Sequence, residues 1–210
     1  MGSRENYYDD KYSGGDYYWG LVPSDTCFRV LKIKPPEKPL KLLDVGCGEG
    51  RNAVFFARNG YKVSAFDLAQ DGIDKTKRLA DKAGVDIDVF KADIIDYRLV
   101  EEYDIIFSTG TLHYIPPENR EEIFQNYKKF TTLNGIHMLS VFVEKPFIAP
   151  APENEKNAYQ WYSGELLRHY HDWEIKFCTE EIFDCMSSGV PHKHATNRIL
   201  AKNTAQGVIL

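Results

Sequence analysis

Hydrophobic residues along the chain occur in short runs that alternate with amphipathic segments, the pattern of a sheet whose strands are connected by helices. The first run covers residues 40–45, is rich in Leu and Val, and suits a parallel strand buried on both faces. Further strands are predicted at residues 61–66, 85–90, 101–108, 137–143, 173–178 and 190–202. Helices are predicted at residues 51–59, 70–82, 116–130 and 164–170, with an earlier one starting at residue 24 or 25. The chain therefore predicts an α/β fold.

Three glycines at alternate positions follow the first predicted strand. Gly46, Gly48 and Gly50 have no Cβ, so the backbone can turn sharply there and approach a ligand closely. The next helix points its amide-rich N-terminus at this turn, where anionic or carboxylate groups are favoured. The second predicted strand ends on Asp67. These features together predict a ligand-binding turn in a β-α-β unit that is closed by an acid.

The spacing of the glycines separates two classes of cofactor site. A dinucleotide site of the form G-x-G-x-x-G would need a third glycine where this chain has Arg51. Instead Asp44 precedes the loop in the order D-x-G-x-G-x-G, which resembles motif I of class I S-adenosylmethionine-dependent methyltransferases. The resemblance implies that Asp44 helps orient the methionine end of the cofactor and that Asp67 accepts hydrogen bonds from both ribose hydroxyls. The alternative is that both acids only cap helices.

Composition limits the partners and the compartment. The chain has 210 residues and a formal net charge of −5, which argues against nucleic acid or an anionic membrane as its main partner. No apolar run approaches the ~20 residues needed to span a bilayer and no secretion signal opens the chain, so a cytoplasmic protein is expected. The four cysteines include no C-x-x-C pair, and neither a metal site nor a disulfide framework is indicated.

The organisation expected from the sequence is one main domain with short additions. We expect an aromatic lid segment and a first helix at residues 1–35, the methyltransferase domain at 36–203 and a tail at 204–210. Residues 6–19 are rich in aromatic side chains and show no helical or strand period. Tyr12, Tyr18 and Trp19 are candidates to shield a sulfonium cation, which aromatic faces attract. The alternative is a tail that packs on the body or is partly disordered.

The resemblance assigns further cofactor-binding residues near the ends of the later strands. It implies that Asp93 hydrogen-bonds the adenine amino group and that the backbone amide of Ile94 meets the ring. Thr109 and Gly110, after the fourth strand, can bring backbone against the cofactor. The remaining candidates flank the glycine turn or Asp67, and they are Cys47, Arg51, Asn52 and Leu68.

Several segments together are similar to the tellurite-resistance methyltransferase group of that superfamily. They are GDYYWGLVPS near the start, the glycine-loop unit from Leu42 to Asp67, STGTLHYI, YSGELLRHYHDWEI and PHKHATNRILAK. The similarity extends from about Tyr7 to Lys202. It implies a Rossmann-like, seven-stranded, mostly parallel sheet in the order 3-2-1-4-5-7-6, with an antiparallel last strand and helices on both faces. It also implies S-adenosylmethionine as cofactor and S-adenosylhomocysteine as product.

The candidate catalytic residues are His113 and three residues of the C-terminal strand. His192, His194 and Arg198 offer cations or donors to an oxyanion acceptor, and alternation along a strand would put them on one face. The alternative for this strand is a solvated edge guarded by charge. His113 and Tyr114 face the acceptor or are structural residues. The long, proline-rich segment 144–161 is also expected to be functional.

The reaction expected from the resemblance is in-line attack on the activated methyl group, for which the enzyme mainly has to position the acceptor. A soft nucleophile such as tellurite or selenite needs little proton removal. Three alternatives remain: an ordinary thiol, amine or carboxylate as acceptor, a nicotinamide-dependent oxidoreductase, and a module that binds cofactor without turnover. The partner in each enzymatic case is a small molecule, and the sequence does not distinguish a monomer from a homodimer.

Overall fold

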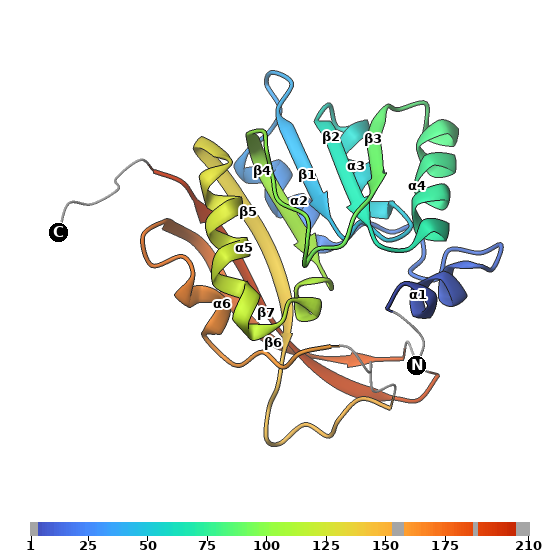
Figure 1. Ribbon diagram of the computed structural model, residues 1–210, viewed down its shortest axis with the longest axis vertical. Coiled ribbons are helices and arrows are strands. Elements are labelled where there is room, and N and C mark those ends of the chain that lie inside the picture. The colour runs from blue at the N-terminus through green and yellow to red at the C-terminus, as the bar shows by residue number, and fades with distance from the viewer. Residues whose placement is uncertain (1–3, 153–157, 187–188, 205–210) are drawn as a thin grey trace.

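The computed structural model describes residues 4–152, 158–186 and 189–204, and these form one twisted sheet with helices on both faces (Figure 1). The seven strands lie in the order β3-β2-β1-β4-β5-β7-β6. Strands β1 to β5 run parallel to one another, and β7 is antiparallel to both β5 and β6. The strands are β1 (Lys41–Val45), β2 (Lys62–Asp67), β3 (Ile87–Lys91), β4 (Tyr103–Thr109), β5 (Thr131–Val143), β6 (Glu174–Cys185) and β7 (His192–Lys202). The predicted fold class is confirmed.

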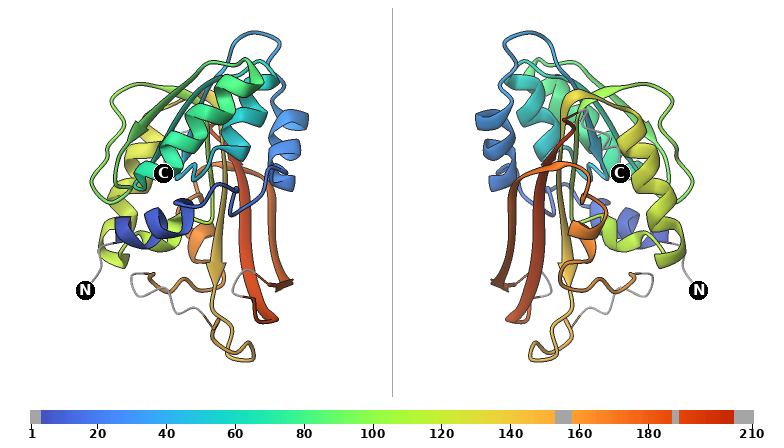
Figure 2. Two further views of the ribbon diagram at one scale, coloured as in Figure 1. Left: turned by 90° about the vertical axis from the view of Figure 1, so that its right-hand side faces the viewer. Right: turned by 90° about the vertical axis from the view of Figure 1, so that its left-hand side faces the viewer.

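The helices form two layers, as the side views in Figure 2 show. Buried residues of α2 (Asp25–Ile33) and α3 (Arg51–Arg58) pack against one face of the sheet. Those of α5 (Pro117–Lys129) and α6 (Glu165–Arg168) pack against the other. Helix α4 (Gln70–Ala83) lies beside α3 and against β3. The remaining helical elements are α1 (Arg4–Tyr12) and the short 3-10 turn η1 (Leu112–Tyr114).

Strand residues alternate between two hydrophobic cores. Leu42 and Ile105 face the α2 and α3 layer, whereas Leu43, Val45 and Ile106 face the α5 layer. All five are fully buried. This explains why β1 reads as a continuous apolar run rather than an alternating one, since a parallel strand covered on both faces has no solvent side.

Two predicted strand boundaries were wrong by more than two residues. β5 begins at Thr131 rather than at residue 137, because Asn134 and Gly135 form a bulge inside the strand instead of ending the preceding helix. Asn134 takes a left-handed φ of 62°, as residues in a bulge often do. β6 continues seven residues beyond the predicted end at 178, because it pairs with β7 all the way to Cys185. Strands β6 and β7 extend beyond the carboxyl ends of β1 to β4 (Figure 1).

The N-terminal segment contains a helix where none was predicted. Tyr8 and Tyr12, four residues apart, lie on one face of α1, and their ring centroids are 5.4 Å apart. The helix lies beyond the carboxyl ends of β1 to β3 in Figure 1. The segment is therefore an ordered element that lies against the end of the sheet.

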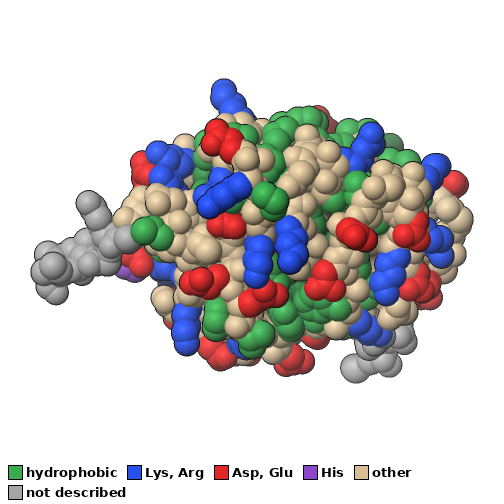
Figure 3. Space-filling model, turned by 90° about the horizontal axis from the view of Figure 1, so that it is seen from above, with side chains coloured by type: hydrophobic (Ala, Val, Ile, Leu, Met, Phe, Trp, Pro, Cys, Tyr) green, Lys and Arg blue, Asp and Glu red, His purple; other side chains and the backbone are tan. Residues whose placement is uncertain are grey.

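Two further observations bear on partners. The face seen from above in Figure 3 mixes acidic and basic side chains and carries no patch of a single sign. Among the described residues, no helix has both the length and the apolar character needed to cross a bilayer. Part of the predicted functional loop, residues 153–157, and most of the predicted tail, residues 205–210, lie outside the described residues.

Candidate active site

A cavity of about 260 Å³ lies at the carboxyl ends of the central strands. Its walls come from the glycine loop after β1, the end of β2, residues 92–94, the end of β4 with η1, and the N-terminal segment. Phe142 on β5, Phe183 on β6, and Thr196 and Arg198 on β7 complete the lining. In an open α/β sheet this is the edge where ligands bind.

The glycine loop has the geometry that its sequence predicts. Gly46, Gly48 and Gly50 have φ values of 71°, 55° and 85°, which side-chain-bearing residues rarely adopt. A Cβ on Gly46 would lie 2.1 Å from Oγ1 of Thr111, so the loop also requires glycine for space. The amides of Gly46 and Cys47 both donate to the carbonyl of Phe66, at 2.9 Å. The loop is therefore held closely against the end of β2.

Asp67 lines the cavity beside this loop. Its Oδ2 accepts the amide of Gly48 at 2.8 Å, and its Oδ1 accepts the amide of Ala69 at 3.0 Å. Burial raises the pKa of this carboxyl, and the backbone hydrogen bonds oppose that shift. Each carboxylate oxygen can accept a second hydrogen bond. Asp67 is thus positioned to accept two hydroxyls of a ligand in the cavity.

Asp44 lies beneath the loop and does not itself line the cavity. Its side chain is 1% exposed, and Oδ2 has no hydrogen-bond partner among the described residues. Burial, followed by the charge of Asp67, raises the pKa of Asp44 to about 7. A buried carboxyl group beneath the loop fits a site whose ligand brings a cationic group to the other side of that loop, such as the ammonium of S-adenosylmethionine.

A buried ion pair attaches the N-terminal segment to the glycine loop. Glu49 is 2% exposed and accepts the amides of Tyr18 at 3.0 Å and Trp19 at 3.1 Å. The Nζ of Lys75, from α4, lies 2.7 Å from Oε1 of Glu49 and donates to the carbonyl of Asp16 at 2.5 Å. The carboxylate and the ammonium therefore both bind backbone groups of residues 16–19.

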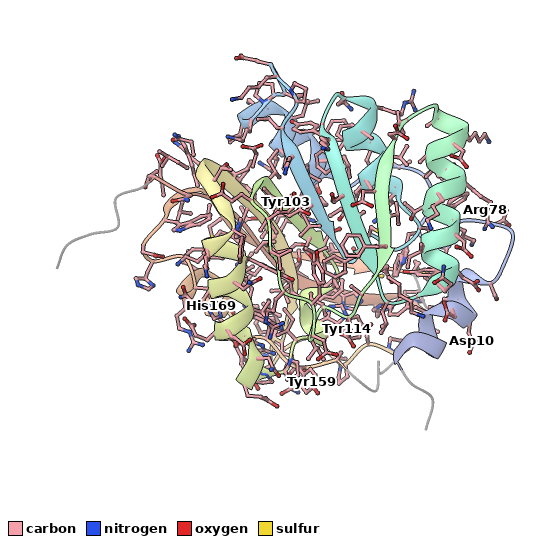
Figure 4. The ribbon with its side chains drawn as sticks, turned by 45° about the horizontal axis from the view of Figure 1, so that its top comes forward. Asp10, Arg78, Tyr103, Tyr114, Tyr159 and His169 are labelled. Atoms are coloured by element: carbon pink, nitrogen blue, oxygen red, sulfur yellow. The ribbon has the colours of Figure 1, made fainter. Side chains whose placement is uncertain are left out.

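Aromatic side chains of this segment cover the loop. The indole nitrogen of Trp19 donates to the hydroxyl of Tyr12 at 2.9 Å. Tyr12 in turn packs on Gly72 of α4, where an added Cβ would lie 3.0 Å from the Tyr12 ring and 2.8 Å from the carbonyl of Gly48. The hydroxyls of Tyr8 and Tyr114 meet at 2.6 Å, and Figure 4 shows Tyr114 at the end of the central strands, on the side of α1. The N-terminal segment thus forms one wall of the cavity.

The predicted cofactor-binding residues converge on this cavity with two exceptions. Asp44 lies below the loop, and Tyr18 contributes its backbone amide to Glu49 without lining the cavity. The predicted residues that do line it are Gly46, Cys47, Gly48, Arg51, Asn52, Asp67, Leu68, Asp93, Ile94, Thr109, Gly110, Tyr12 and Trp19.

The predicted acceptor-side residues divide into two groups. His113 and Arg198 line the cavity. Arg198 donates to Asp25 and Glu181, both at 3.1 Å, which orients its guanidinium. His192 and His194 do not belong to the lining, although they share one face of β7 as predicted. The ring of His194 stacks on that of Phe142 at a centroid distance of 4.7 Å, and Phe142 lines the cavity whereas His194 does not.

Sequence reasoning did not assign several lining residues. Glu49 lies inside the glycine motif but pairs with Lys75, 26 residues away, so its role depends on a distant partner. Tyr8 and Tyr114 meet across 106 residues of chain. The full set that was not assigned is Tyr8, Gly20, Glu49, Phe66, Ala92, Thr111, Phe142, Phe183 and Thr196. For Tyr8, the sequence offers one indication, which is its helical spacing from Tyr12.

The sheet order, the left-handed glycine loop and the acid that ends β2 agree with the resemblance to the Rossmann-like fold of class I methyltransferases. The family model described as tellurite resistance protein TehB matches residues 2–201. The chain belongs to the TehB family.

Individual relatives agree with this assignment. A protein of Haemophilus influenzae named "Probable S-adenosyl-L-methionine-dependent methyltransferase TehB" is 26% identical over 173 residues, which are 82% of this chain and 56% of that protein. The chain therefore spans little more than half of that relative. The crystal structure of TehB from Haemophilus influenzae superposes with a TM-score of 0.76 at 25% identity, covering 95% of this chain and 67% of that one.

A more distant structure shares the fold alone. The magnesium protoporphyrin IX methyltransferase of Synechocystis, solved with bound S-adenosylhomocysteine, has a TM-score of 0.64 at 16% identity. The superposition covers 85% of this chain and 80% of that one.

Proposed function

We propose that the chain binds S-adenosylmethionine in this cavity and transfers its methyl group to a small soft nucleophile, such as the oxyanions tellurite or selenite. The observation that carries the proposal is the carboxylate of Asp67, which lines the cavity and is held by the amide of Gly48 at 2.8 Å. Membership of the TehB family supports the same cofactor and this class of acceptor. The four cysteines lie in the described part of the chain and form no disulfide there, in keeping with a protein that works in the cytoplasm.

The residues that would hold the cofactor follow the cavity from one end to the other. Asp93 and Ile94 would take the adenine, and Asp67 the ribose hydroxyls. The glycine loop with Asp44 beneath it would take the methionine end. Tyr12 and Trp19 would cover the sulfonium, because aromatic faces attract cations and their bulk keeps water away.

The bound cofactor supplies a methyl group that is already activated on sulfur, so the chain has to orient the acceptor and exclude water. Arg198 and His113 line the acceptor end of the cavity and are the groups that would bind an anion there. The guanidinium of Arg198 has five N–H donors, and its hydrogen bonds to Asp25 and Glu181 leave others for a ligand. No side chain is required to remove a proton from an anionic acceptor.

The cofactor assignment is tested by calorimetry with S-adenosylmethionine and S-adenosylhomocysteine. Hydrogen bonds to a charged group contribute about 1.5–3 kcal/mol, so Asp67→Ala should weaken both ligands by roughly 10- to 100-fold. The matched control is Asp81→Ala, which removes an exposed carboxylate on α4 and should bind like wild type. Equal affinities for wild type and Asp67→Ala would overturn the proposed cofactor site.

The acceptor is tested separately by measuring S-adenosylhomocysteine formation with tellurite, selenite and a panel of metabolite thiols, amines and carboxylates. Turnover with the two oxyanions, reduced in Arg198→Gln while cofactor affinity is kept, would support the proposal. Turnover only with an ordinary metabolite would replace the proposed acceptor and leave the cofactor site intact. Cofactor binding without product from any acceptor would favour a binding module instead.

A further inference from the structure

We propose that Cys185, His192 and His194 form a binding site for a borderline-soft divalent metal ion such as Zn²⁺, at the end of the β6–β7 pair. Cys185 and His192 are cross-strand partners in the register of these strands. His194 follows two residues later on β7, and residues two apart point to the same side of a strand. One candidate ligand atom from each of the three side chains lies within 4.8 Å of the other two.

The spacing of these atoms is close to that of a tetrahedral site. Zinc–nitrogen bonds of about 2.0–2.1 Å and zinc–sulfur bonds of about 2.3 Å place two nitrogen ligands roughly 3.3 Å apart and nitrogen and sulfur roughly 3.6 Å apart. The Nε2 atoms of His192 and His194 are 2.9 Å apart. On binding a metal, the two Nε2 atoms would move apart by about a few tenths of an ångström. The sulfur of Cys185 would move toward them by rotation of its side chain, which is partly exposed.

The orientation of His192 also favours a metal. Its Nδ1 lies 2.7 Å from the carbonyl of Val190, and because a carbonyl only accepts, Nδ1 carries the hydrogen. In the neutral ring Nε2 then carries the lone pair, and this atom lies 2.9 Å from Nε2 of His194. A backbone carbonyl that fixes the remaining ring nitrogen is the usual outer partner of a metal-binding histidine.

The third ligand is equally well supported. The ring of His194 lies near Phe142 at a centroid distance of 4.7 Å and near Phe183 at 5.7 Å. An apolar surround of this kind limits solvent access to a metal ligand. Both phenylalanines line the cavity, so a metal at this cluster would join β6 and β7 close to that part of the cavity wall. Three protein ligands would leave a fourth position for water or a small ligand.

No sequence motif indicates this site, because its ligands come from two strands. The spacing C-x₆-H-x-H matches none of the C-x-x-C or H-x₃₋₅-H patterns of common zinc motifs. Only the antiparallel register brings residue 185 opposite residue 192. Binding would release the proton of the Cys185 thiol, because the thiolate is the form that ligates metal.

Cobalt(II) titration of the reduced full-length protein, without cofactor, tests the inference. We expect one Co²⁺ per chain, strong visible bands typical of tetrahedral cobalt, and a near-ultraviolet thiolate-to-cobalt charge-transfer band that Zn²⁺ displaces. Cys185→Ser should abolish the charge-transfer band, and His194→Ala should lose the tetrahedral spectrum. The matched controls Cys178→Ser and His171→Ala remove an exposed thiol and an exposed imidazole outside the cluster and should retain both signals.

Thermal unfolding provides a second readout that does not depend on a spectrum. A metal that binds only the folded chain raises the unfolding midpoint, so Zn²⁺ should stabilise wild type and Cys178→Ser but not Cys185→Ser. Without metal, Cys185→Ser and wild type should unfold at the same temperature, which shows that the variant folds. Weak, octahedral-type cobalt spectra in wild type, or a charge-transfer band that survives in Cys185→Ser, would overturn the inference. None of these outcomes depends on methyl transfer.

Discussion

Asp44 and Asp67 lie on either side of the glycine loop, and burial raises the pKa of both carboxyls. Asp67 obtains hydrogen bonds from two backbone amides, whereas one oxygen of Asp44 has no partner among the described residues. With a pKa of about 7, Asp44 is protonated in a large share of molecules at neutral pH. The two acids of the motif therefore lie in different environments, because backbone amides bind both oxygens of Asp67 and leave one oxygen of Asp44 without a donor.

The raised pKa of Asp44 predicts a stability that falls as pH rises. Between about pH 4 and pH 7 the unfolded chain loses the proton of this carboxyl while the folded chain retains it, so unfolding becomes more favourable. The effect is on the order of 4 kcal/mol at most. Asp44→Asn should remove this slope, measured as the free energy of unfolding in urea across that pH range. The exposed Asp88→Asn is the control, and profiles of wild type and Asp44→Asn that run parallel would contradict the assignment.

At this scale the sequence predicted what lies close together along the chain. The glycines, Asp44 and Asp67 were predicted because one β-α-β unit contains all of them. Glu49 was not, because only the contact with Lys75 shows that its carboxylate is buried and paired. Likewise, His192 and His194 were correctly expected on one face, but Phe142 lines the cavity and His194 does not, and no pattern within β7 indicates that.

Among the elements, the N-terminal segment is held to the glycine loop and α4 by a buried ion pair. This attachment consists of the Glu49–Lys75 pair and the backbone groups that the two side chains bind. Removing one partner of a buried ion pair leaves an uncompensated charge, which costs about 3–5 kcal/mol. The segment and the glycine loop should therefore lose order together.

A double-mutant cycle tests this coupling. Glu49→Gln and Lys75→Met should each destabilise the protein by about 3–5 kcal/mol in urea unfolding, and the double variant should be less destabilised than the sum. As a control, separating the exposed pair Lys193 and Asp184 should change stability by less than about 1 kcal/mol. Strict additivity of the two buried substitutions would show that the pair is not the link.

Element boundaries were predicted less well than the elements themselves, for identifiable reasons. The helix α1 was missed because its sequence is polar apart from tyrosines, and Tyr8 and Tyr12 contact residues at the end of the sheet and on α4 rather than a core face. The early start of β5 was missed because Asn134-Gly135 is a genuine turn signal that this fold uses in a bulge. In each case a tertiary contact decided the boundary.

Over the whole molecule, the alternation of strands and helices was enough to predict the sheet. The order of its strands came from the resemblance to a family, since hydrophobic period alone does not say which strands are neighbours. The buried polar network between β5 and the α5 layer was not predictable. There His137 lies 2.7 Å from Oγ1 of Thr131 and 2.6 Å from the hydroxyl of Tyr170.

His137 predicts a pH dependence of stability opposite in sign to that of Asp44. Burial, together with the nearby Lys128 charge, lowers the pKa of His137 to about 3. As pH falls from about 6.5 the unfolded chain gains a proton that the folded chain does not bind, so stability is lost on acidification, on the order of 5 kcal/mol at most.

Between about pH 4 and pH 6.5, the contributions of Asp44 and His137 to the free energy of unfolding change in opposite directions with pH. The free energy of unfolding of wild type should therefore change little with pH in that range. His137→Gln should leave the Asp44 slope alone and give a protein whose free energy of unfolding increases on acidification. Urea unfolding of wild type, both single variants and the double variant would measure this. A His137→Gln profile that still falls steeply toward low pH would contradict it.

Gly72 sits inside α4, where alanine would be the better helix former by about 0.8–1.0 kcal/mol. The methyl group of that alanine would lie 2.8 Å from the carbonyl of Gly48 and 3.0 Å from the ring of Tyr12. An alanine at position 72 can thus be accepted in evolution only if the glycine loop or the aromatic ring moves away from it. Substitution at this position is constrained by positions 48 and 12 together, although neither is near it in the chain.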